Sequence, residues 1–140
     1  MKKLVLAFIG VSVITITFAQ KINVPAEVSK AFAAKFPNAT EVKWGKENAK
    51  EYEAEFKINN VPVSANFGTD GSWKETETTI KASELPAEVT KSVNTKYPGA
   101  EYSVCERIEK PGNKLMYEVN IKVKGKKKEL EFNPDGSIAK

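Results

Sequence analysis

Carboxylates are the main side chains in this chain that could act as acids or bases. The sequence contains no histidine, which excludes Ser-His and Cys-His nucleophile systems, most zinc sites and the commonest general base. Glu51, Glu53 and Glu55 occupy alternate positions, so in a strand they project from one face about 7 Å apart. This spacing is compatible with the carboxyl pair of an inverting glycosidase.

The surroundings of these glutamates favour a solvated surface over a catalytic cleft. A catalytic pair needs a cleft that raises the pKa of one carboxyl group, whereas this run continues into Lys57 on an open strand. A calcium site at the glutamates or at Asp70 lacks the dense Asp/Asn loop that such sites use. We therefore expect no catalytic residues, no metal site, no cofactor and no enzyme activity.

Cys105 is the only cysteine, so an intramolecular disulfide is impossible. In an oxidising compartment an unpaired thiol can link two copies into a dimer or serve as a reactive group. The alternative, which we favour, is a small half-buried strand residue.

The segment Lys124–Lys128 is the one run of like charge. Such a run attracts anionic polysaccharide, lipopolysaccharide or an acidic protein, or it protects a hairpin edge from aggregation. Glu129 and Glu131 follow directly and no aromatic residues are interleaved, which argues against binding of nucleic acid. The candidate binding residues in this run are Lys126, Lys127 and Lys128.

The two tryptophans are the best candidates for anchors at an interface, because aromatic residues dominate binding energetics. Trp44 alternates in step with Val42, which predicts that both lie in the core. Trp73 begins a strand that continues with charged residues and threonines, which predicts an exposed ring and a binding residue.

The first 19 residues have the pattern of a secretory signal peptide. Lys2 and Lys3 precede an apolar run, Leu4–Ile14, and Ala19 suits the last position before cleavage. The run is too short for a membrane span, and an uncleaved anchor is the alternative. We expect the mature chain to begin at Gln20 and to act in the periplasm or outside the cell.

The remaining chain suits one domain with a nearly neutral surface. About 120 residues are enough for one compact domain but not for two independent ones. Loss of Lys2 and Lys3 lowers the formal charge from +4 to +2. That charge is too small for the electrostatic footprint of a nucleic-acid-binding protein.

The chain contains an internal repeat. Val24–Ala39 and Leu85–Ala100 are identical at eight of sixteen positions, 61 residues apart. Tyr52–Ile58 matches Tyr117–Val123 at an offset of 65, so the second copy has a longer loop around Lys110–Asn113. We interpret this as a duplication within the single domain of residues 20–140, with repeats 20–82 and 83–140.

Each copy begins with a phrase that predicts a short amphipathic helix. Val28, Phe32 and Phe36 recur every fourth residue and form one apolar stripe. A proline follows the stripe in both copies and disfavours helix in the residue before it. The next residue, Asn38 or Gly99, suits the left-handed conformation that ends a helix.

After each helix the apolar period changes to two, which predicts strands. Asn59-Asn60 and Lys124-Gly125 are predicted two-residue hairpin turns. Strict alternation places Val104, Glu106 and Ile108 on one face of their strand and Cys105 on the other. One apolar and one polar face per strand is typical of an antiparallel sheet covered on a single side.

These elements predict an α+β fold. Each repeat supplies one helix and about four antiparallel strands, which is a marginal core alone. Two repeats side by side form one sheet of up to eight strands, with both helices on one face and the polar face open.

The chain resembles the PepSY-like, beta-lactamase-inhibitor-like proteins found among exported proteins of Bacteroidetes. The resemblance lies in the two helix phrases, the strand around Trp44, the paired YEAEF and YEVNI strands and the two DGS turns. It implies a tandem helix-plus-sheet fold like that of beta-lactamase inhibitor protein, and an envelope or extracellular location. It also implies a link to peptidase inhibition, but no inhibitory or catalytic residue transfers to this chain.

The sequence therefore predicts an exported, non-enzymatic binding module of inhibitor-like type. It would engage a protein or peptide through the open sheet face or the loops, with Trp73 and the three lysines as candidate contacts. The alternative is an envelope sensor or binding protein for a small molecule or glycan, which needs a concave pocket.

Overall fold

The computed structural model describes residues 22–139. The predicted signal peptide, 1–19, and the predicted mature start at Gln20 lie outside the described residues.

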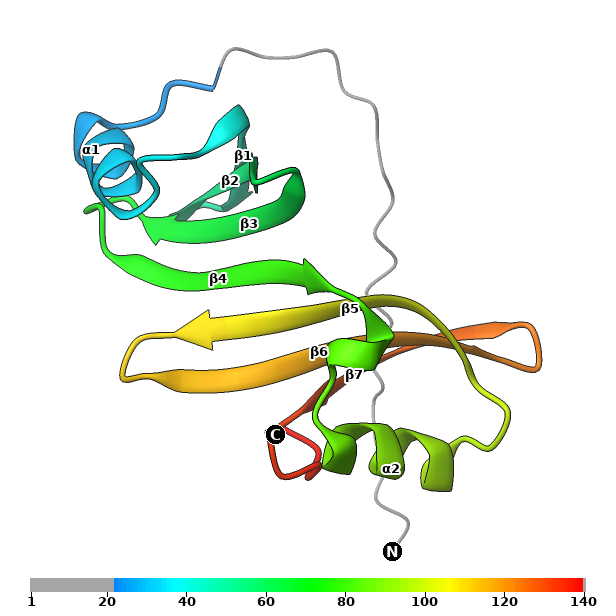
Figure 1. The fold of residues 1–140 in the computed structure, drawn as a ribbon. Coiled ribbons are helices and arrows are strands. Elements are labelled where there is room, and N and C mark those ends of the chain that lie inside the picture. The colour runs from blue at the N-terminus through cyan, green and yellow to red at the C-terminus, as the bar shows by residue number, and fades with distance from the viewer. Residues whose placement is uncertain (1–21, 140) are drawn as a thin grey trace, which may run out of the picture.

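The described chain is an α+β fold built on one antiparallel sheet (Figure 1). The seven strands are ordered β1-β2-β3-β4-β5-β6-β7, so every strand pairs with its neighbours in the chain. The first half contains α1 (Ala26–Lys35), β1 (Thr40–Asn48), β2 (Glu51–Ile58), β3 (Val61–Gly68) and β4 (Trp73–Ile80). The second half contains the 3-10 turn η1 (Ala82–Glu84), α2 (Ala87–Lys96), β5 (Glu101–Lys110), β6 (Lys114–Val123) and β7 (Lys126–Phe132).

Both predicted helices form. Pro25 and Pro86 are the residues directly before α1 and α2, and their carbonyl oxygens accept the N–H groups of Ser29 and Thr90 at 3.0 and 3.1 Å. Proline fits there because its own missing N–H needs no partner. Gly99 follows α2 in the left-handed conformation, with φ 75°, as predicted.

The two hairpin turns are confirmed. Asn59 and Asn60 have φ of 51° and 67°, and Lys124 and Gly125 have φ of 48° and 79°. Positive φ at both central residues is the geometry that matches the twist of the flanking strands. The prediction for Asn38 is wrong, because Asn38 is not among the residues with positive φ.

The core consists of two apolar clusters, one beneath each helix. In the first, Phe32 of α1 meets Phe56 and Trp44 edge to face, each at 5.1 Å between ring centroids. Trp44 thus packs against the core, as predicted. In the second, Val89 and Val93 of α2 are fully buried against β5, β6 and β7.

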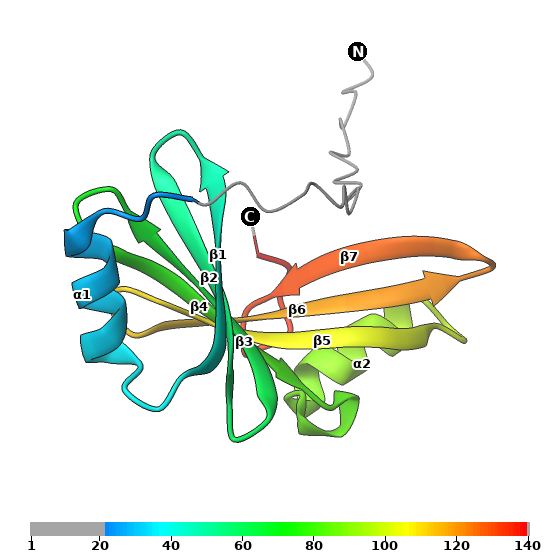
Figure 2. The same ribbon diagram turned by 90° about the horizontal axis from the view of Figure 1, so that it is seen from above.

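Strand β4 joins the two clusters. Thr76 lies opposite Ala65 of the first cluster, and Ile80 lies opposite Cys105 of the second. Since alternate residues of a strand point to the same side, both clusters touch the same side of β4. Figure 2 shows how strongly the sheet twists between β1–β3 and β5–β7.

Three details of the sheet differ from the prediction. The eighth strand is not formed among the described residues, where only an isolated bridge joins Phe132 to Ile138. An irregularity between Tyr102 and Cys105 reverses the alternation in β5, because a bulge adds an unpaired residue. Cys105 is therefore buried in the core, whereas Val104 is 43% exposed.

A similar irregularity shapes β1. The register shifts between Thr40 and Lys43, where Glu41 has φ 54°. As a result Val42 is exposed and does not share the core position of Trp44, contrary to the prediction.

Corresponding contacts occur in the two halves of the chain. Gly71 and Gly136 both have φ 81°, and a Cβ at either position would meet the carbonyl oxygen of Glu27 or Glu88 within 3 Å. Each turn therefore packs directly on the backbone of the first turn of its helix.

Candidate functional site

The strongest concentration of chemically active side chains lies on the side of the sheet away from the two core clusters. Cross-strand pairing runs from Glu53 on β2 through Asn66 on β3 to Glu75 on β4. A second run goes from Thr79 on β4 through Glu106 on β5 and Glu118 on β6 to Glu131 on β7. We call this surface the glutamate face. Its carboxyl groups are those of Glu53, Glu55, Glu75, Glu77, Glu106, Glu118, Glu129 and Glu131.

Two apolar side chains lie among these carboxyl groups. Ile108 on β5 is opposite Glu77 on β4 and opposite Met116 on β6. The exposed fractions of Ile108 and Met116 are 2% and 3%. Buried apolar neighbours reduce the hydration of adjacent carboxylates, which favours their neutral form.

Glu77 and Glu118 are the most strongly affected acids. Burial, together with the nearby carboxyl groups of Glu106 and Glu75, raises the pKa of Glu77 to about 7. Burial also raises the pKa of Glu118 to about 7, against the opposing effect of a hydrogen bond from Asn120. Both groups therefore exchange protons near neutral pH.

Glu53 and Glu106 are shifted in the same direction. Burial is the main cause of the raised pKa in each case, followed by Glu47 for Glu53 and by Glu129 for Glu106. The hydroxyl of Thr79 donates a hydrogen bond that partly offsets the effect at Glu106.

Lysines lie on the same side of the sheet, at positions 43, 57, 110, 114, 122 and 127, but one of them alone pairs with a carboxyl group of the glutamate face among the described residues. Lys110 on β5 forms an ion pair with Glu75, with Nζ to Oε2 at 3.0 Å. Burial lowers the pKa of Lys110, but the hydrogen bond to Glu75 and the negative charges of Glu75, Glu131 and Glu77 together outweigh it and leave the pKa raised. No other ion pair within residues 22–139 involves a carboxyl group of the glutamate face.

The polar residues between the glutamates act as donors toward them. Ser64 donates to Glu77 at 3.2 Å, and the side-chain amide of Asn66 donates to Glu75 at 3.1 Å. The Oδ1 atom of Asn66 is buried and accepts no hydrogen bond from any described residue.

A hollow of about 220 Å³ lies at one end of the glutamate face. Glu55, Ser64, Thr79 and Glu106 contribute its polar lining, so its chemistry suits a hydrogen-bond donor or a cation. Its remaining lining residues are Phe56, Pro62 and Val63.

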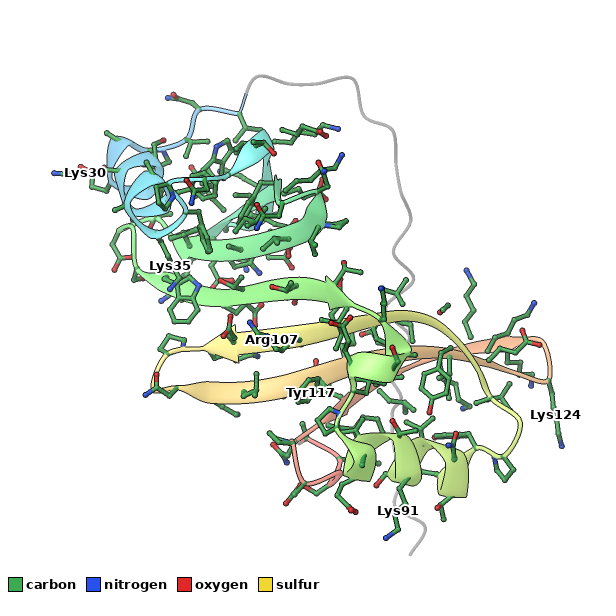
Figure 3. All side chains as sticks on the ribbon, viewed as in Figure 1. Lys30, Lys35, Lys91, Arg107, Tyr117 and Lys124 are labelled. Atoms are coloured by element: carbon green, nitrogen blue, oxygen red, sulfur yellow. The ribbon has the colours of Figure 1, made fainter. Side chains whose placement is uncertain are left out.

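Trp73 does not lie on the glutamate face. Its ring is partly buried against the first cluster, and its indole N–H donates to the Thr76 hydroxyl at 2.9 Å. Lys35 of α1 covers the ring, with Nζ 3.6 Å from the centroid (Figure 3). These contacts correct the expectation of a freely exposed ring, and a role for Trp73 in binding stays a prediction.

The lysine run lies on the hairpin between β6 and β7, whose tip carries Lys124 at the far end of the sheet from α1 (Figure 3). Lys126, Lys127 and Lys128 are all exposed and form no ion pair with a described residue. Their role in binding also stays a prediction. They are not brought together with Trp73, which lies at the start of β4.

Cys105 is 3% exposed and packs in the second cluster. Burial, and secondarily the carboxylate of Glu106, raises the pKa of its thiol. A dimer linked through this thiol would require the second cluster to open.

The predicted strand of alternating glutamates contributes to the glutamate face through Glu53 and Glu55. Within residues 22–139, no three metal-ligating side chains gather closely enough to hold a metal ion. The sequence reasoning missed Glu77, Glu106 and Glu118. The alternation of polar and apolar residues places polar side chains on one face of each strand. Only the cross-strand register shows that these three residues lie on one continuous surface.

The family of the chain is established by a match to the PepSY-like family model, described as "Putative beta-lactamase-inhibitor-like, PepSY-like". The model matches residues 16–63 and 50–140. The chain belongs to this family. Membership favours a non-enzymatic binding module, in agreement with the resemblance seen in the sequence.

Solved structures share the fold. A DUF2874 family protein from Bacteroides ovatus is 21% identical, with a TM-score of 0.75 over 85% of this chain and 86% of that chain. A BLIP-like protein from Bacteroides fragilis is 22% identical, with a TM-score of 0.72 over 86% of each chain. A Bacteroides eggerthii protein, described as one of the "putative periplasmic proteins", is 20% identical, with a TM-score of 0.76 over 85% and 88%.

Comparison with curated protein sequences finds no match. Among residues 22–139, the helices are too short and too polar for any of them to cross a membrane.

Proposed function

We propose that this protein is an exported, non-enzymatic binding module whose glutamate face engages a cationic segment of a protein or peptide. The observation that carries the proposal is the set of eight carboxyl groups on one side of β2 and β4 to β7, of which Glu75 alone forms an ion pair with a described lysine. Export is supported by the signal-like sequence of residues 1–19 and by the periplasmic description of a protein with the same fold.

The arrangement of the repeats is part of the proposal. The two halves place their helices on the same side of the sheet, which leaves the glutamate face free of helices. The support comes from β4, whose Thr76 and Ile80 belong to the same side and contact different clusters. A tandem duplication accounts for the corresponding contacts of Gly71 and Gly136.

A cationic partner fits the electrostatics of the face. A lysine or arginine side chain near Glu77 and Glu118 favours their ionised forms and returns their pKa values toward the ordinary range. Binding then releases protons, so affinity rises between pH 6 and pH 8.

The test is retention of a partner from an envelope extract by immobilised mature protein at pH 8. The variant Glu77→Gln/Glu118→Gln removes two charges from the face, and Glu27→Gln/Glu88→Gln removes two exposed charges from the first turns of the two helices. The proposal predicts that the first variant loses the partner and the second retains it. Equal retention by both variants would show that the partner binds another surface.

A second candidate function is binding of a small molecule or glycan. It is favoured by a hollow of about 310 Å³ beside α2, which is lined by Glu88, Lys91, Ser92, Thr95, Lys96, Phe132, Gly136 and Ile138. A ligand that binds only the folded state raises the melting temperature. A thermal-shift screen of cell-wall fragments, bile acids and metal salts tests this candidate, and no shift across the screen rejects it.

A further inference from the structure

The outer edge of β7 is open along most of its length. On one side β7 pairs with β6 from Lys126 to Phe132 without interruption. On the other side, among residues 22–139, only Ile138 pairs with it, opposite Phe132. The Ala139 N–H donates to the Glu131 carbonyl at 2.9 Å, and the Asn133 N–H donates to the Ser137 carbonyl at 2.8 Å.

These two hydrogen bonds fix the direction of the backbone groups. They show that the main-chain groups of Glu131 and Asn133 point toward the outer edge. In an antiparallel ladder the direction alternates with every residue, so the N–H and C=O groups of Lys127 and Glu129 also point outward. No described residue forms a main-chain hydrogen bond with them there.

The opposite edge of the sheet differs from this one. The pairing of β1 with β2 shifts register between Thr40 and Lys43 and again between Lys46 and Asn48. Such irregularities increase the twist of an edge strand and disfavour its pairing with another strand. The pairing of β7 contains no shift, so its edge keeps the regular spacing that an added strand needs.

The first half of the chain shows what a strand at this position looks like. By sequence offset, Val63, Ala65 and Phe67 of β3 correspond to Lys128, Leu130 and Phe132 of β7. In the first half, β4 pairs along β3, with Thr76 opposite Ala65 and Thr78 opposite Val63. The corresponding positions beside Leu130 and Lys128 hold no strand in the described part of the chain.

The positive charge at the start of β7 favours an acidic strand as the one that pairs with this edge. Lys126, Lys127 and Lys128 are exposed and without ion pairs to described residues. A second copy of β7 matches this edge less well than an acidic strand does. Every two-fold register centred on a residue of 126–131 sets at least one pair of like charges opposite each other, even where Lys127 meets Glu129 or Glu131. An acidic strand instead meets a lysine at three successive positions.

We propose that the open edge of β7 binds an extended, acidic segment of a partner protein as an eighth antiparallel strand. Main-chain hydrogen bonds to Lys127 and Glu129 provide the attachment, and the three lysines provide the selectivity. Glu129 belongs to both surfaces, but the edge binds through main-chain groups and the glutamate face through carboxyl groups, so this proposal can fail or hold independently of the proposed function.

The probe is the fluorescein-labelled peptide Thr-Val-Thr-Glu-Glu-Glu, which places its acids opposite the lysines when it runs antiparallel to β7. Fluorescence anisotropy measures binding to the mature protein at low salt. Amide hydrogen exchange, followed by NMR, then reports which backbone groups become protected. We expect the amides of Lys127 and Glu129 to slow by about tenfold or more, and those of Lys126, Lys128 and Leu130 to stay unchanged.

Two matched comparisons separate strand addition from simple charge attraction. The peptide with three lysines in place of its glutamates, and the acidic peptide N-methylated at alternate residues, should both fail to bind wild-type protein. Lys126→Glu/Lys127→Glu/Lys128→Glu should abolish binding of the acidic peptide, whereas Lys30→Glu/Lys91→Glu/Lys114→Glu should preserve it.

Three outcomes overturn the proposal. Absence of binding is the first. Binding without alternating protection, or unaffected by N-methylation, assigns the lysines to electrostatic attraction alone. A concentration-dependent dimer that protects the same amides without peptide assigns the edge to a second copy.

Discussion

Glu106 of β5 and Glu118 of β6 lie directly opposite each other in the antiparallel ladder. Like charges at such a position destabilise a sheet when both are ionised. Both carboxyl groups are half-buried, and each has a raised pKa caused first by burial. This pair therefore shows, at one point of the sheet, the electrostatic strain that the whole glutamate face carries above neutral pH.

The stability of the protein should fall as pH rises from 5 to 8. The folded-state pKa values of Glu77 and Glu118, about 7 each, lie above their ordinary value, so the folded state binds more protons than the unfolded state. Their contribution is present below about pH 4.5 and is lost as pH rises through 7. Allowing for solvent screening, we expect each group to account for about 1 kcal/mol.

Urea unfolding at pH 5, 6, 7 and 8, at constant ionic strength, measures this dependence. A free energy of unfolding that is constant or rises over this range would contradict the raised pKa values.

Removing one acid from the face should stabilise the protein at high pH. Glu118→Gln keeps the shape of the side chain but cannot ionise, so at pH 8 we expect unfolding to cost about 1 kcal/mol more than in wild type. At pH 5 the two proteins should differ little. Glu27→Gln, at an exposed position of α1, serves as the control, and an equal gain there would indicate a general charge effect.

The sequence predicted the helices and hairpin turns well because their signals are local. Pro25 and Pro86 mark where helices begin, and Asn59-Asn60 specifies a turn by its tolerance of positive φ. These features depend on a few neighbouring residues. The fold class followed from them without knowledge of any long-range contact.

The sequence did not reveal the glutamate face, because that surface depends on register. The irregularity between Tyr102 and Cys105 shifts Glu106 and Ile108 to the side opposite Cys105 and the core. Strict alternation had placed Glu106 and Ile108 on one face with Tyr102, which packs against the core. A bulge of one residue moves every later side chain of its strand to the other face of the sheet. The residue types in this segment do not predict such a bulge.

The close contact of the last turn with α2 makes Gly136 sensitive to substitution. A Cβ at this residue would lie 2.5 Å from the Glu88 carbonyl oxygen, and φ is 81°. Gly136→Ala should therefore lower stability by about 2–4 kcal/mol. Gly112 has φ 78° with open space around it, so Gly112→Ala should cost only about 1 kcal/mol.

Chemical denaturation of these two alanine variants separates the effect of backbone strain from that of the steric contact. Equal losses of stability in both would show that the turn moves away from α2 at little cost.

Cys105 should react slowly with thiol reagents in the native protein. Its thiol is buried in the second cluster and its pKa is raised, whereas thiol reactions require an accessible thiolate. We expect alkylation by iodoacetamide, followed by mass spectrometry, to be at least about 100-fold slower in buffer than in urea. Similar rates in both, or a dimer that dissociates on reduction, would place the thiol at the surface.

The most direct test of the glutamate face is the titration of its carboxyl groups by NMR in protein labelled with carbon-13 at the glutamate side chains. Glu77 and Glu118 should titrate with midpoints near pH 7, well above the exposed Glu27 in the same sample. Midpoints for both near the ordinary value of 4.5 would show that these carboxyl groups are fully hydrated. In that case the face would not be the coupled acidic surface on which the proposed function depends.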